Sequence, residues 1–113
     1  MLALLPFLAV AQTSFTFDHV VAISAVGVSG RSATHTDAVE AAVVDGSFQP
    51  PHAGDVVHLP NGRTATWRDA VADKTGNFSG DAFSGGYAFA TYDARQPEVM
   101  ILEAAGHSMV YVN

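Results

Sequence analysis

Short strand-like runs separated by turn-forming residues are the feature that most limits what this chain can fold into. Each run is rich in β-branched and aromatic residues, and glycine, proline or asparagine follows within a few positions. Several short strands with turn signals between them predict a mainly β fold, an antiparallel β-sandwich or jelly-roll-like arrangement. The strands are expected near residues 56–59, 64–71, 87–92, 99–105 and 108–112.

The clearest local signal is a hairpin centred on Asn61-Gly62. This dipeptide supplies the positive φ angle that a tight turn needs, and strand-forming residues lie on both sides of it. A further strand is expected upstream, because residues 14–17 alternate polar and aromatic side chains. The β-branched and small residues that follow continue this extended pattern to Gly30.

A single short helix is expected near residues 37–45. Asp37 can cap its first turn, Glu40 follows three positions later, and Asp45-Gly46 ends the pattern. The valines of this segment would also tolerate a strand, because β-branched side chains restrict the helical rotamers. The sequence therefore predicts at most one short helix.

The last strand pattern runs to Asn113 without a closing turn. We expect residues 108–112 to pair antiparallel with residues 99–105 across a turn at Gly106, which can take positive φ without a Cβ clash. The next strand would then be missing, and the open edge would be prone to self-association. On this interpretation residues 12–113 are one β-sandwich module that is incomplete at its C-terminus, an N-terminal fragment of a longer protein.

The composition excludes several classes of protein. Hydrophobic residues make up 49% of the chain and charged residues 14%, so the chain is expected to fold. The formal net charge is -6 and the basic residues are scattered, whereas a phosphate backbone demands a basic face, so nucleic acid is not expected as a partner. The chain has no cysteine, which excludes disulfides and thiol catalysis.

Residues 1–11, MLALLPFLAVA, have the features of a signal peptide. The run is apolar and ends in Ala9-Val10-Ala11, the small-x-small pattern of a cleavage site before Gln12. It is shorter than the ~20 apolar residues that span a bilayer, so no stable membrane span is expected. The run lacks a preceding basic residue, and a buried strand or short core helix is the alternative. The pattern favours export to the periplasm, the cell surface or the medium.

Gly106-His107-Ser108-Met109 matches the beginning of the Gly-x-Ser-x-Gly elbow of α/β-hydrolases, which makes Ser108 a candidate nucleophile. The fifth position, however, is Val110, and the residues after Ser108 favour a strand over the helix that the elbow needs. The other members of a triad would also have to follow in the few residues that remain. We therefore interpret Ser108 as a polar residue that opens a strand, and assign no catalytic residue.

Two segments contain the residue types of metal sites. His52, Asp55 and His58 could approach one ion as two imidazoles and a carboxylate, although the sequence has no tight ligand pairing. The loop 73–81 places oxygen-bearing side chains at alternate positions, but it lacks the glycine and the glutamate that an EF-hand loop needs. Surface histidines and a polar hairpin loop are the preferred interpretations. No metal or other cofactor is assigned, and calcium binding by the loop 73–81 stays open.

Aromatic residues at alternate strand positions offer a different chemistry, a flat face on which a sugar ring can stack. Such residues more often fill a core, because their burial stabilises the sheet. Only an exposed cluster would indicate binding. The aromatic candidates are Trp67, Tyr87, Phe89, Tyr92 and Tyr111.

The second half of the chain resembles a known type of module. The segments TWRDAVADKTGNF, FSGGYAFATY and VMILEAAGHSMVYVN are similar to the galactose-binding-like β-sandwich accessory modules near the start of large exported bacterial hydrolases. Those modules pair a tryptophan-bearing strand with a late G-x-x-x-V-x-VNG strand, which Trp67 and the run from Gly106 to Asn113 match except for the final glycine. The resemblance implies a non-catalytic role, in binding or positioning, beside a separate catalytic domain.

Three hypotheses for function follow from these observations. The first is a non-catalytic, carbohydrate-associated accessory module of a larger exported hydrolase, with carbohydrate and the missing C-terminal domain as its partners. The second is part of a serine hydrolase that uses Ser108. The third is a structural cell-surface module that neither binds glycans nor turns over a substrate.

Export predicts a processed N-terminus. Because a signal peptide is removed during secretion, mass spectrometry of the protein secreted by its host should find an N-terminus at or near Gln12. A soluble cytosolic product that retains Met1 would contradict this prediction.

Overall fold

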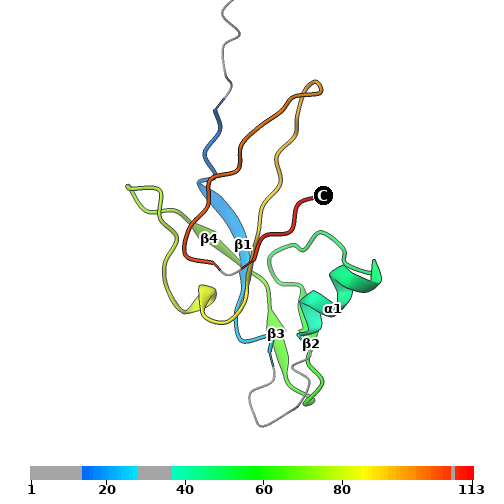
Figure 1. Cartoon of the computed structure of the whole chain (residues 1–113). Helices are drawn as coiled ribbons and strands as arrows, with labels where there is room; N and C mark the ends of the chain where they lie inside the picture. Colours follow the sequence, from blue (N-terminus) through cyan, green and yellow to red (C-terminus); the bar gives the residue numbers. More distant parts are fainter. Residues whose placement is uncertain (1–13, 28–36, 108) are drawn as a thin grey trace, which may run out of the picture. The chain divides into compact units, whose positions relative to one another are not determined.

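The computed structural model describes most of the chain, namely residues 14–27, 37–107 and 109–113. The signal peptide expected at residues 1–11 therefore lies outside the described residues. The chain divides into two compact units, and every described helix and strand belongs to the larger one, Thr16–Thr91 (Figure 1).

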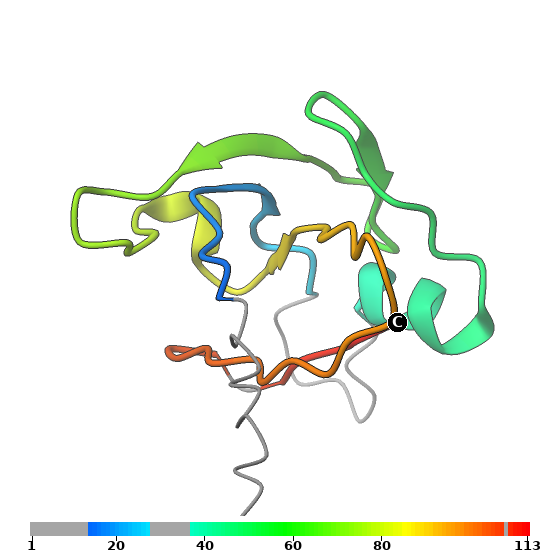
Figure 2. The same ribbon diagram turned by 90° about the horizontal axis from the view of Figure 1, so that it is seen from above.

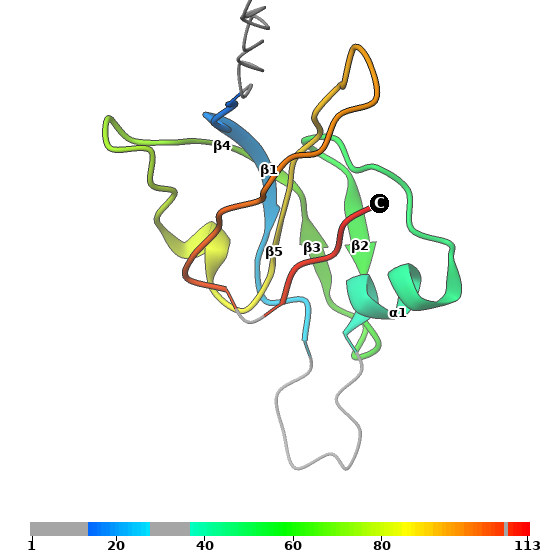
Figure 3. The same cartoon turned by 45° about the horizontal axis from the view of Figure 1, so that its top comes forward.

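Two antiparallel sheets form the framework of the larger unit (Figure 3). The three-stranded sheet has β1, His19–Ile23, at its centre, flanked by β4, Arg68–Val71, and β5, Tyr87–Phe89. The two-stranded sheet pairs β2, Val56–His58, with β3, Thr64–Thr66. All of these pairings are antiparallel, which confirms the prediction of a mainly β chain with antiparallel sheets.

β1 lies at the centre of its sheet because it is apolar on both faces, which suits a strand that is covered on both sides. Val20 and Ala22 point to one face and Ile23 to the other, and all three are buried. Ile23 belongs to the main hydrophobic core. The short 3-10 helix η1, Asp81–Phe83, lies beside β1 (Figure 2).

The hydrophobic core draws side chains from nearly every element of the larger unit. Partly buried residues of β2, β3 and β5 pack against it, so both sheets and the helix share one core. Burial of this apolar surface is the main favourable term that holds the elements together. The buried members of the core are Ile23, Val26, Val39, Leu59 and Trp67.

The strand expected over residues 64–71 divides between the two sheets at Trp67. β3 precedes this residue and β4 follows it, while the Trp67 N–H donates to the carbonyl of Asp55 at 2.9 Å and its carbonyl accepts from the Gly54 N–H at 2.8 Å. The Trp67 side chain is only 3% exposed. One extended segment thus serves both sheets, a common way to build a corner in β proteins.

The expected helix is present as α1, Ala38–Asp45. Asp37 caps it, since Oδ1 accepts from the N–H groups of Val39 at 2.8 Å and Glu40 at 3.2 Å, and Gly46 ends it with φ of 78°. No helix among the described residues is long and apolar enough to cross a membrane.

The expected hairpin joins β2 and β3 in antiparallel register. Its turn uses the two residues differently: Gly62 takes positive φ of 78° and donates its N–H to the Leu59 carbonyl, whereas Asn61 accepts from the Arg63 N–H through its side chain. The pattern matches a turn followed by a left-handed glycine, which is common in three-residue hairpin loops.

The two C-terminal strands of the prediction are wrong. The described residues of 99–105 and 108–112 belong to no strand, although Gly106 does take positive φ, at 82°. Strand propensity largely measures how well a side chain packs against neighbours in a sheet, and two strands alone are marginal. The side chains of Val99 and Val112 are almost fully exposed, so the packing that would turn propensity into a strand is missing.

Two other strand boundaries differ from the prediction. The described residues 14–17 are not in a strand, and β5 ends at Phe89 instead of continuing to Tyr92. Both segments lie beyond the register of β1, which pairs with β4 from His19 onward and with β5 only as far as Phe89. An alternating pattern forms a strand only where a neighbouring strand completes its backbone hydrogen bonds.

Gly86 lies against the backbone of β1 immediately before β5. A Cβ atom added to Gly86 would stand 1.7 Å from the Ile23 carbonyl oxygen, far inside van der Waals contact. Such a close approach of two backbones requires a residue without a side chain.

Gly86→Ala should therefore lower the free energy of unfolding by about 3 kcal/mol, because the backbone must shift to admit the methyl group. Gly27→Ala is the matched control: among the described residues nothing lies within 4 Å of its added Cβ, so the change should stay within about 0.5 kcal/mol. Urea unfolding followed by the fluorescence of the single tryptophan measures both values. Equal midpoints for the two variants would contradict the close approach.

Candidate functional site

The histidine candidates for a metal site are not brought together as one ligand group. The His52 N–H donates to Oδ2 of Asp55 at 2.7 Å, and the Nδ1 atom of His52 lies 3.6 Å from the same oxygen. His58 lies on β2 with an exposed side chain. Over the described ranges, no three His, Asp or Glu side chains are placed to hold one metal ion. Asp55 instead closes the turn that leads into β2.

The loop 73–81 uses its oxygen-bearing side chains to organise itself. Oδ1 of Asp73 accepts from the Thr75 hydroxyl at 2.6 Å, the Thr75 N–H at 2.8 Å and the Asn77 N–H at 3.0 Å. These hydrogen bonds, that from the Thr75 hydroxyl first, lower the pKa of the exposed Asp73 carboxyl. The carboxylate that would lead a calcium site is thus engaged with donors of its own loop.

Ser108, the candidate nucleophile, lies outside the described residues. Its neighbour His107 has an exposed side chain, and Gly106 has a left-handed backbone.

The five aromatic candidates differ in how deeply they are buried. Trp67 is in the core, and Tyr87 and Phe89 pack against it. Tyr92 and Tyr111 remain exposed, by 36% and 44%. Because Tyr87 and Phe89 are half-buried, Tyr92 and Tyr111 are the most exposed of the five candidates.

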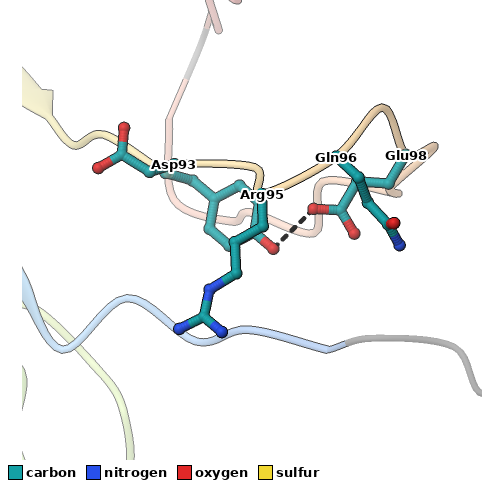
Figure 4. A pocket seen from close by; sticks show the side chains of 5 residues that line it. Asp93, Arg95, Gln96 and Glu98 are labelled. Atoms are coloured by element: carbon teal, nitrogen blue, oxygen red, sulfur yellow. Dashed lines mark hydrogen bonds between the residues drawn. The ribbon is translucent and has the colours of Figure 1, made fainter.

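Tyr92 lies at an open hollow in the smaller unit (Figure 4). The hollow has a volume of about 590 Å³ and is formed by the loop that follows β5. Arg95 extends away from this loop, with Asp93 to one side and Gln96 and Glu98 to the other (Figure 4). Every lining residue is exposed to solvent.

Two neighbours hold the Tyr92 ring. Its hydroxyl donates to Oε1 of Glu98 at 2.8 Å, and the ring of Phe15 packs at a centroid distance of 5.1 Å and an angle of 50°. The hydrogen bond to Glu98, followed by desolvation and the negative charge of Glu98, raises the pKa of the Tyr92 phenol. The ring therefore has a defined orientation although it is on the surface.

The side chains that line the hollow suit the binding of a polar ligand. The Tyr92 ring offers an apolar face, Asp93 and Glu98 accept hydrogen bonds, and Arg95 and Gln96 donate them. Among the described residues of the lining, the ionisable groups are the carboxylates of Asp93 and Glu98, the guanidinium of Arg95 and the phenol of Tyr92. The arrangement can recognise a molecule with one apolar face and several hydroxyl groups.

Comparison with known protein families, with curated proteins and with solved structures finds no match to this chain. Only Tyr92 was among the candidates drawn from the sequence. The other residues of the hollow could have been recognised as a cluster of charged and amide side chains in a proline-bearing loop after an aromatic strand. The residues missed are Asp93, Arg95, Gln96 and Glu98.

Removal of Glu98 should return the pKa of Tyr92 toward its ordinary value. In Glu98→Ala both the hydrogen-bond acceptor and the negative charge disappear, so the tyrosinate forms at lower pH. Ultraviolet absorbance titration measures this change, with Tyr92→Phe to identify the signal of Tyr92. Glu103→Ala, which removes another exposed glutamate, should leave the titration unchanged. The same Tyr92 pKa in wild type and Glu98→Ala would show that the pair does not form in solution.

Proposed function

We propose that this chain is a non-catalytic, carbohydrate-associated accessory module of a larger exported hydrolase, and that the hollow beside Tyr92 binds saccharide. One observation carries the proposal: an exposed aromatic ring is held by two neighbours at a hollow lined with hydrogen-bonding side chains. Ligand sites commonly combine an aromatic surface with a few polar groups that fix orientation.

The Tyr92 ring provides the stacking surface. The C–H face of a pyranose ring is apolar, and its contact with an aromatic ring removes apolar surface from water. Because the Glu98 hydrogen bond and the Phe15 ring already orient Tyr92, binding loses little side-chain freedom. A surface tyrosine without such supports would have to be ordered by the ligand.

The polar side chains favour a neutral saccharide. Asp93 and Glu98 contribute two carboxylates against the single guanidinium of Arg95, which leaves one net negative charge on the lining. This charge repels uronic-acid and sulfated glycans, while the carboxylates accept from neutral hydroxyl groups. The ligand class that fits is a neutral oligosaccharide of pyranose units.

A sandwich-like arrangement and export are parts of the same proposal. Two antiparallel sheets that share one core are compatible with an antiparallel β-sandwich or jelly-roll-like architecture. The apolar run at residues 1–11 supports export, because it ends in the small-x-small pattern of a signal-peptide cleavage site. An exported module with a neutral-sugar site would meet its ligands in the periplasm, at the cell surface or in the medium.

Titration of the purified chain with neutral and acidic soluble polysaccharides tests the proposal. Wild type should bind a neutral polysaccharide, and Tyr92→Ala should bind it about tenfold more weakly, because the stacking surface is lost. Tyr111→Ala is the matched control, since it removes the other exposed tyrosine but no residue of the hollow, and its affinity should equal that of wild type.

Three results would overturn the proposal. Absence of binding to every glycan would favour a structural cell-surface module. Equal losses in Tyr92→Ala and Tyr111→Ala would place binding elsewhere. Release of a hydrolysis product by wild type, abolished in Ser108→Ala of the full-length protein, would identify a serine hydrolase instead.

A further inference from the structure

We infer that Asn77 is a modification site, at which an oligosaccharide is attached to the side-chain amide nitrogen during export. Asn77, Phe78 and Ser79 match the pattern Asn-x-Ser/Thr, with x other than proline, that accepts glycans in surface loops of secreted proteins. The inference goes beyond the proposed saccharide site, because Asn77 is not among the residues that line the hollow. It rests on one part of the proposed function, export.

The structure places this pattern where an enzyme can reach it. Residues 77–79 lie in the loop between β4 and η1 and belong to no helix or strand. Asn77 and Ser79 are exposed, whereas Phe78 between them is partly buried. The Phe78 ring packs against that of Phe83 at a centroid distance of 5.9 Å. Phe78 thus anchors the segment to the fold, while the residues that carry the amide and the hydroxyl stay on the surface.

The hydrogen bonds of the loop are compatible with a glycan on Asn77. Its Nδ2 atom donates to the Thr75 hydroxyl oxygen at 2.9 Å, which uses one of the two hydrogens of the amide. The backbone of Asn77 is bonded separately, since its N–H donates to Oδ1 of Asp73 at 3.0 Å and its carbonyl accepts from the Asp73 N–H at 2.8 Å. Replacement of the second amide hydrogen by a sugar leaves each of these bonds in place.

The reaction is a glycosyl transfer from an oligosaccharide that is linked to a lipid pyrophosphate, catalysed by a transferase of the export compartment. The Nδ2 atom of Asn77 forms a bond to the anomeric carbon of the first sugar, and the bond from that carbon to the pyrophosphate oxygen breaks. The amide gives one proton to a base of the transferase. The lipid pyrophosphate leaves with the electron pair of the broken bond.

Asn61 provides a comparison within the same chain. It is also exposed and also lies in a loop, but the residue two positions later is Arg63, which has no hydroxyl group. Exposure of an asparagine is therefore not sufficient for the pattern. The feature that distinguishes Asn77 is the Ser79 hydroxyl, which a transferase can contact together with the amide.

Peptide mass mapping of the full-length protein exported by its host tests the inference. The peptide that contains Asn77 should be heavier than its sequence by whole sugar residues, and a peptide N-glycosidase should remove this mass and convert the Asn77 amide to a carboxylate. The modification should be lost in Asn77→Gln and in Ser79→Ala, but kept in Ser79→Thr, which retains a hydroxyl. Asn61→Gln is the matched control and should be modified as wild type is. Equal fluorescence of Trp67 in all variants verifies the fold.

The same spectra separate failure of the inference from failure of export. A processed N-terminus near Gln12 together with an unmodified Asn77 overturns the inference and leaves the proposed function standing. A modification that persists in Ser79→Ala shows that attachment does not depend on the pattern, and also overturns it. A product that retains Met1 and carries no sugar contradicts both the inference and the export on which it rests.

Discussion

Burial of Trp67 is the interaction on which the rest of the larger unit depends. Its peptide group is bonded to the loop at residues 54–55, and its indole packs in one cluster with side chains from β1 and α1. The hairpin of β2 and β3 would be only marginally stable alone, as two-stranded hairpins are in water. Trp67 attaches this hairpin to the three-stranded sheet, because the same extended segment continues into β4. Removal of the indole would take the largest buried side chain out of the core that the two sheets share.

The distribution of buried apolar surface explains why one apolar segment forms a strand and another of similar composition does not. All the buried hydrophobic residues of the described chain belong to the larger unit, where β1 is covered on both faces. The run at residues 99–102 is at least as apolar as β1, yet it remains exposed and forms no strand. Strand propensity is realised only where a neighbouring strand and a covering layer are available.

The candidate site begins where the core ends. Tyr87 and Phe89 still pack against the core, whereas Tyr92 lies beyond the last pairing of β5 and is held by Glu98 and Phe15 instead. A side chain that is released from the core but still oriented is suited to binding, since it offers apolar surface at low cost in conformational freedom. On the proposed function, the charged residues of the adjoining loop would select among ligands by their charge.

Local signals in the sequence were enough for several features whose partners lie within a few residues. The Asp37 cap, the Gly46 stop, the turn at Gly62 and the positive φ of Gly106 all follow from hydrogen bonds or steric rules that operate inside one turn. The division of residues 64–71 between two sheets could not be read in this way. The sequence also did not predict which aromatic rings are buried, or the contact between Tyr92 and Glu98. These features depend on which segments meet in space. A pattern of apolar residues predicts that side chains will be buried, but it does not predict which residues they will contact.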